Sequence, residues 1–209
     1  MKKLIPIFLL LLLSSWSLTA QVVFGVREGE AYSSMVQKTE GVYHVGSKFG
    51  YSVAGLAEIH LYKRLSLRPE VAFVKQGGSF LSDYEVDGVR NTYSDCSVYS
   101  LQIPVNLSFT FPVYDVKLSF LTGPVADVPL FGKIKTQNQH EDISFGNKDG
   151  KDLRPFDLGI DAGLIVEYKN CFFSIIGTFG TIDRLPGKHS NQSPLYQNNA
   201  TFSLGYVFR

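Results

Sequence analysis

Apolar and polar residues alternate along most of the chain, and this period of two is typical of a β-strand. The clearest segment is 156–168, where the even-numbered positions are all apolar or aromatic and most odd-numbered positions are small or acidic. Segment 98–111 has the same pattern, and 49–61 and 65–75 show weaker versions. Four further segments are candidates, at 22–33, 117–130, 172–183 and 199–208. The pattern therefore predicts eight strands in total.

The two faces of these strands distinguish a soluble barrel from a membrane barrel. A soluble sheet turns its apolar face inward, whereas a membrane barrel turns it toward lipid and keeps polar groups inside. Here the polar face is rich in Gly and Ser, and the apolar face is nearly unbroken. Aromatic residues gather at both ends of the apolar face, as in the girdles of membrane barrels. They are Phe49, Tyr51, Tyr99, Phe156 and Phe202 at one rim and Phe111, Tyr168, Phe173 and Phe208 at the other.

The strands are long enough to cross a membrane. From Tyr99 to Phe111 the chain makes about 40 Å of strand, or about 30 Å of height when tilted by ~40°. Short connections near 62–64, 112–115 and 169–171 alternate with long ones at 34–47, 80–95, 132–153 and 184–198. Membrane barrels combine short periplasmic turns with longer extracellular loops in this way. The sequence therefore predicts an all-β fold, a single eight-stranded antiparallel up-and-down transmembrane β-barrel.

The N-terminus predicts export. Residues 1–20 combine two lysines, an apolar stretch and a small, polar exit, as in a secretory signal peptide. We therefore expect a signal peptide at 1–20, a barrel domain at 21–209 and an outer-membrane location. With 44% hydrophobic and 19% charged residues and a formal charge of +1, the chain has no footprint for nucleic acid. Two cysteines, Cys96 and Cys171, fall at opposite rims of the predicted barrel and are expected to be unpaired.

Several segments resemble the PorT-like outer-membrane β-barrel family. They are FGVR at 24–27, YSS at 32–34, LSLRPEV at 65–71, QIPV at 102–105, LTGP at 121–124 and DLGIDAG at 157–163. The resemblance covers nearly the whole mature chain and implies an eight-stranded barrel in the outer membrane. Members are commonly labelled porin-like, and the namesake is linked to protein secretion. The chain departs from the pattern at Glu28 and Glu30, where apolar or small residues are expected, and at its last residue, Arg209.

Charged residues at inward positions are the candidate functional residues. An eight-stranded barrel encloses only enough space for side chains, so these groups are expected to pair into a plug that fills the lumen. A proton or ion path is the alternative. The predicted network consists of Arg27, Glu58, His60, Arg68, Glu70, Lys117, Asp157, Asp161 and Glu167.

The sequence favours no enzyme. The four histidines lack the spacing of metal ligands, and neither a metal nor a cofactor is expected. His189 and Ser190 suggest a lipid hydrolase only weakly, because their loop lacks the rigid third group that catalysis needs. We expect a monomeric structural or interaction protein that contacts outer-membrane lipid and presents its four long loops to a protein or ligand partner. The alternatives are a soluble exported barrel that binds a small apolar ligand and, third, an outer-membrane lipid-modifying enzyme.

Overall fold

A computed structural model describes residues 22–39, 42–80, 84–86, 89–91, 94–136, 139–148, 150–187 and 193–209. The predicted signal peptide and the pair His189–Ser190 lie outside these residues. Eight long strands are described: β1 (Val22–Thr39), β2 (Val42–Tyr62), β3 (Leu65–Phe80), β6 (Ser94–Val113), β7 (Val116–Thr136), β9 (Asp157–Tyr168), β10 (Cys171–Gly180) and β11 (Leu195–Phe208). The described part of the chain contains no helix long and apolar enough to cross a membrane.

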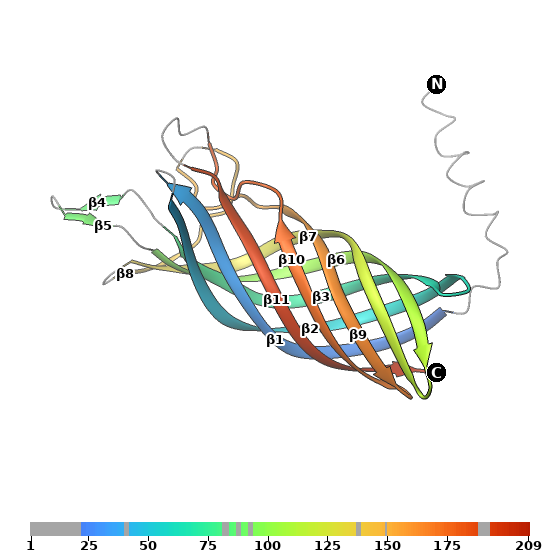
Figure 1. The fold of residues 1–209 in the computed structure, drawn as a ribbon. Helices are drawn as coiled ribbons and strands as arrows, with labels where there is room; N and C mark the ends of the chain where they lie inside the picture. The colour runs from blue at the N-terminus through green and yellow to red at the C-terminus, as the bar shows by residue number, and fades with distance from the viewer. Residues whose placement is uncertain are drawn as a thin grey trace, which may run out of the picture.

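The eight long strands close into one antiparallel barrel. Each pairs with its neighbours in the order β6-β3-β2-β1-β11-β10-β9-β7, and β7 pairs with β6 to close the sheet. The first and last strands also pair, with Phe24 opposite Phe208. Figure 1 shows the strands wrapping obliquely around a common axis, with the C-terminus at the end where β1 begins. The predicted fold class is therefore confirmed.

The two ends of the barrel differ in their connections. At one end, which we call the short-turn end, tight turns carry Lys63, Tyr114 and Lys169 in the left-handed region, with φ of 41°, 54° and 56°. At the other, which we call the long-loop end, the strands run on further than the sequence predicts. Within the predicted loop 34–47, residues 34–39 and 42–47 are not a loop but the paired outer parts of β1 and β2. Segment 80–95 includes the small hairpin of β4 (Tyr84–Val86) and β5 (Val89–Asn91), and β8 (Gln139–Asp142) extends the sheet beside β7.

The two faces of the wall follow the predicted alternation. In β9 the acidic and glycine positions turn inward, and Ile160, Leu164 and Val166 face outward with 52%, 41% and 43% of their surface exposed. Most charged side chains of the strands therefore face the interior, and the exposed outer wall is apolar, so the alternative of a soluble barrel with an apolar ligand site inside is wrong. Glu28 and Glu30 also face outward, next to Leu204 and Phe202 of β11.

Aromatic rings form a belt on the outer wall toward the long-loop end. Tyr51 and Phe73 lie 6.3 Å apart between ring centroids, Phe73 and Tyr99 6.0 Å, and Tyr99 and Phe131 4.7 Å. Rings also meet near the short-turn end, where the Tyr206 and Phe208 centroids are 5.5 Å apart. The two groups of rings fit the girdles expected at the two faces of a bilayer.

Beyond the aromatic belt the wall folds over itself. The outer part of the β1–β2 hairpin lies against the end of β3, where the Ser33 hydroxyl donates to the Gly77 carbonyl (2.9 Å) and accepts from the Gly77 amide (2.8 Å). Gly78 permits this approach, because a Cβ there would overlap the Gly46 carbonyl. The long-loop end has an apolar core of its own, formed by Met35, Cys96, Val98, Ile143, Leu153 and Leu195.

Candidate functional site

The interior of the barrel holds all nine residues of the predicted network, at different depths. Seven are buried: Arg27, Glu58, Arg68, Glu70, Asp157, Asp161 and Glu167. His60 and Lys117 keep 43% and 44% of their side chains exposed, because they lie at the mouth of the short-turn end. The nine residues therefore form several layers along the lumen rather than one cluster.

The central layer is a fully buried ion triad. Glu70 on β3 has no exposed side-chain surface and accepts from Arg27 Nε at 2.7 Å and from Arg68 Nε at 2.9 Å. Arg27 also donates through Nη1 to Ser52 Oγ (3.0 Å) and Ser203 Oγ (3.3 Å), which reach it from the neighbouring strands β2 and β11. The triad thus ties together the four neighbouring strands β3, β2, β1 and β11, and its two guanidinium groups share one carboxylate.

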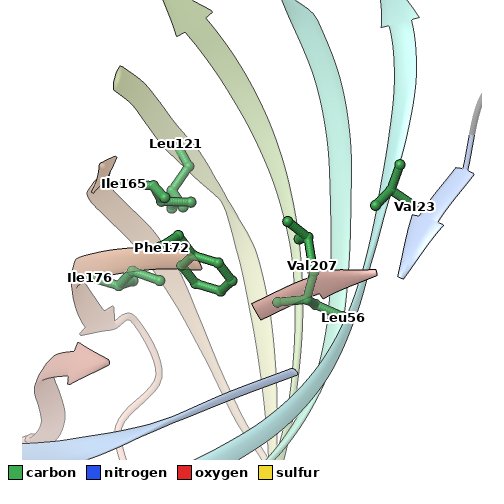
Figure 2. Packing of buried hydrophobic residues seen from close by; sticks show 7 residues of the cluster. All are labelled: Val23, Leu56, Leu121, Ile165, Phe172, Ile176 and Val207. Carbon is green, nitrogen blue, oxygen red and sulfur yellow. The ribbon is translucent and has the colours of Figure 1, made fainter. Parts of the chain in front are cut away.

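An apolar layer adjoins the triad. Arg68 lies over the ring of Phe172, with its guanidinium carbon 4.7 Å from the ring centroid. Figure 2 shows Phe172 close to Leu121, Ile165 and Ile176, with Val207, Leu56 and Val23 continuing the cluster on the other strands. All seven residues are buried. Apolar side chains packed in the lumen exclude water, so this layer and the triad together obstruct the interior.

Asp161 occupies a polar site without a neighbouring cation in hydrogen-bond range. Its carboxylate accepts from Thr178 Oγ1 at 2.6 Å and from Asn106 Nδ2 at 3.2 Å. These partners come from β10 and β6, on opposite sides of β9 and β7. Neutral donors therefore stabilise this carboxylate, whereas the sequence predicts only that the inward charged residues pair into a plug, without giving Asp161 a partner.

A second polar layer lies toward the long-loop end. Gln76 donates to the Asp127 carboxylate, and Asp127 stands opposite Asp157 in the register of β7 and β9. Arg184, which is 1% exposed, brings Nη1 to 3.6 Å from Asp157 Oδ2. Arg184 is absent from the predicted network because it follows β10 in an irregular segment, where no alternation indicates that the side chain turns inward.

The mouth at the short-turn end is charged and open. Glu167 accepts from Lys117 Nζ at 3.0 Å and from Arg209 Nη2 at 3.0 Å. His60 Nδ1 lies 2.9 Å from Ser66 Oγ and 4.0 Å from Glu58 Oε1. A cavity of about 220 Å³ lies here, and its lining includes Glu58, His60, Ser66, Lys117 and Glu167. Arg209 therefore joins the charged network at the short-turn mouth, although no pattern in the sequence predicts that its side chain reaches Glu167.

The two additional arginines change the charge balance of the interior. The predicted network sets Arg27, Arg68 and Lys117 against five carboxylates. Arg184 and Arg209 raise the number of bases to five, and Asp127 raises the number of acids to six. The interior charges are thus nearly balanced before His60 is counted. In the described residues, no three His, Cys, Asp or Glu side chains are grouped so that they could hold a metal ion.

The family comparison decides between the classes of barrel. The family described as "Outer membrane protein beta-barrel domain" matches residues 17–183, which is most of the chain. The chain belongs to this family. An outer-membrane location follows from that membership. This location agrees with the apolar residues exposed on the outer wall of the barrel.

Solved structures with similar folds are distant in sequence. Neisserial surface protein A shares 13% identity at a TM-score of 0.48, over 88% of this chain and 97% of that one. Ail, the attachment invasion locus protein of Yersinia pestis, shares 12% at 0.46, over 90% and 99%. A major outer membrane protein from Thermus thermophilus shares 11% at 0.48, over 90% and 99%. No curated protein matches the chain.

Proposed function

We propose that this outer-membrane barrel is a non-conducting, non-enzymatic structural or interaction protein that acts through its long-loop end. The observation that carries the proposal is the obstructed lumen. The triad of Arg27, Glu70 and Arg68 and the apolar layer around Phe172 fill the middle of the barrel with buried side chains. An eight-stranded barrel has no spare cross-section for a pore once such side chains occupy it.

The long-loop end supplies the surface for interaction. β1 continues seven residues beyond Tyr32 and β7 five beyond Phe131, whose rings belong to the aromatic groups of the outer wall. A spanning strand needs only about 9–11 residues, so these extensions project from the membrane. We propose that this end faces the outside of the cell, because long connections are extracellular in bacterial barrels. Rigidly held loops and hairpins are common recognition surfaces.

The finer assignments are part of the same proposal. The segments at 65–71, 102–105 and 157–163 support a PorT-like barrel. The lysines and apolar stretch of 1–20 support a cleaved signal peptide, and N-terminal sequencing of the mature protein tests the cleavage site. We propose a monomer, since the eight barrel strands complete each other's pairing.

Planar-bilayer recording tests the closed lumen. Purified wild-type protein should give no sustained conductance, because buried pairs and apolar side chains leave no continuous water path. Arg68→Ala is the sharpest variant, since it removes the contact with both Glu70 and Phe172. Steady ion-selective channels in the wild type, with a changed selectivity and an unchanged thermal stability in Arg68→Ala, would replace this proposal by a transport function.

Labelling with a membrane-impermeant maleimide tests the orientation. In a Cys171→Ser background, Lys151→Cys at the long-loop end should react in intact cells, and Asp115→Cys at the short-turn end should react only after the outer membrane is permeabilised. Both positions are exposed. The reverse order of labelling would contradict the proposed orientation and with it the role of the long-loop end.

A further inference from the structure

A lysine-rich groove lies on the outer wall at the long-loop end, away from the lumen. Its volume is about 670 Å³, and its walls come from β2, β3, β6, β7 and β8 and from the segment that follows β8. Four lysines line the groove, and two acids face them. The lysines are Lys48, Lys75, Lys133 and Lys135, and the acids are Asp95 and Asp142.

The lysines stand at the height of lipid headgroups. Lys75 is in register with Tyr99, and Tyr99 with Phe131, so Lys75 lies in a row with two rings of the aromatic belt. Lys133 and Lys135 follow Phe131 on the same face of β7, about 7 and 13 Å further along the strand. Aromatic belts mark the membrane–water interface. The three lysines therefore occupy the level of the interface and the headgroup region just outside it.

The contacts within the groove leave its charge positive. Lys48 Nζ on β2 pairs with Asp95 on β6 at 2.8 Å, although β3 lies between these two strands in the sheet. Lys75 Nζ lies 5.9 Å from the centre of the Tyr99 ring, a contact that orients the ammonium group without neutralising it. The floor of the groove is apolar, formed by Leu130, Phe131, Ile143 and Phe145. A ligand that fits combines negative charge with an apolar part.

We infer that this groove binds the phosphorylated headgroup of an outer-leaflet lipid. Lysine ammonium groups bind phosphate oxygens, and clusters of basic residues next to a membrane bind anionic headgroups. Tyr99 and Phe131 of the aromatic belt line the groove, so a lipid can place its phosphate among the lysines and its chains along the apolar wall below. The inference rests on the proposed orientation, in which the long-loop end faces outward.

Native mass spectrometry of protein released from nanodiscs tests the inference. The nanodiscs contain phosphatidylcholine with a minor fraction of a bis-phosphorylated glycolipid of the lipid A type, or of the same glycolipid without phosphates. The test variant is Lys133→Gln/Lys135→Gln. The matched control is Lys63→Gln/Lys169→Gln, which removes two outward lysines that lie over Tyr62 and Tyr168 at the opposite rim.

The phosphorylated glycolipid should be retained by the wild type and the control but about 30-fold less by the test variant. That ratio corresponds to about 2 kcal/mol, or about 1 kcal/mol for each lysine near an anionic surface. Asp95→Asn should increase retention, because it frees Lys48 from its partner. Raising the salt concentration should weaken retention in the wild type.

Three results would overturn the inference. The first is equal retention by the wild type and the test variant, and the second is equal retention of the dephosphorylated glycolipid. The third is full displacement by millimolar inorganic phosphate, which would mean that the groove takes a soluble anion. If maleimide labels the two ends in the expected order and any of these three results is found, the lipid site is wrong but the proposed interaction role stands. Reversed labelling would remove the role itself.

Discussion

Replacing Glu70 by Gln is the most direct test of the buried triad. Gln keeps the shape of the side chain and removes its charge, which strands Arg27 and Arg68 at 6% and 3% exposure. The variant loses two charge-assisted hydrogen bonds, of 2.7 and 2.9 Å. Such bonds contribute about 1.5–3 kcal/mol each. Breaking a buried pair costs about 3–5 kcal/mol, and we expect the free energy of unfolding to fall by that amount.

Two further variants show whether burial of the triad is the cause of the expected loss of stability. Asp95→Asn breaks the Lys48 pair, which has a similar distance of 2.8 Å but side chains 31% and 45% exposed, and should cost about 1 kcal/mol or less. Replacing the triad together, by Arg27→Met/Arg68→Met/Glu70→Leu, should restore most of the lost stability, since apolar residues of similar size replace buried ion pairs well.

The assay is urea unfolding of each variant in lipid vesicles at neutral pH, followed by far-UV circular dichroism. The mature chain expected from residue 21 contains no tryptophan, so circular dichroism is preferable to fluorescence. If Glu70→Gln loses no more than Asp95→Asn, water screens the triad. The lumen would then be hydrated rather than dry, and the conductance experiment would become the deciding one.

Three other substitutions test other parts of the structure. Leu164→Arg on the lipid-facing wall should cost about 2–4 kcal/mol in vesicle unfolding, and Leu164→Ala much less; equal costs would place this face away from lipid. Glu28→Leu should stabilise the barrel by about 1–2 kcal/mol in vesicles. At the same denaturant concentration it should not stabilise the barrel in detergent that leaves the outer wall hydrated. A loss of stability in vesicles would argue against the outward register of β1. Arg184→Ala should lower the free energy of unfolding by about 3 kcal/mol, because it leaves buried Asp157 unpaired, against about 1 kcal/mol for the half-buried neighbour Arg154→Ala.

The barrel itself could be predicted because its signal is local and repeated. Every second residue of 98–111 and 156–168 faces lipid, and that requirement is visible in the residues alone. The same alternation identifies Arg27, Arg68 and Glu70 as inward, since a strand fixes the face of each side chain. Which charges meet depends on the register between strands, and the period of two does not determine it. For this reason the pairing of Asp161 with neutral donors could not be predicted.

The rest of the interior comes from segments without a period. Arg184 enters the lumen from an irregular connection. Its backbone amide donates to the Leu195 carbonyl (2.8 Å), and its carbonyl accepts from the Arg154 backbone amide (2.9 Å). Arg209 reaches Glu167 from the chain terminus. The sequence also does not predict the outer parts of β1 and β2 as strands. Beyond the membrane one face packs on β3 and the other meets water, so the apolar alternation that marks the spanning part is lost.

The separate apolar core of the long-loop end has a consequence for how the molecule opens. Met35, Cys96 and Leu195 pack there, while Phe172, Ile165 and Val23 pack in the lumen, so two groups of contacts stabilise two regions. Regions with their own cores open as separate cooperative units, each with its own free energy. We expect the extramembrane part to unfold and refold without disturbing the spanning wall. The extramembrane part can then rearrange through partial unfolding while the spanning wall stays folded in the bilayer.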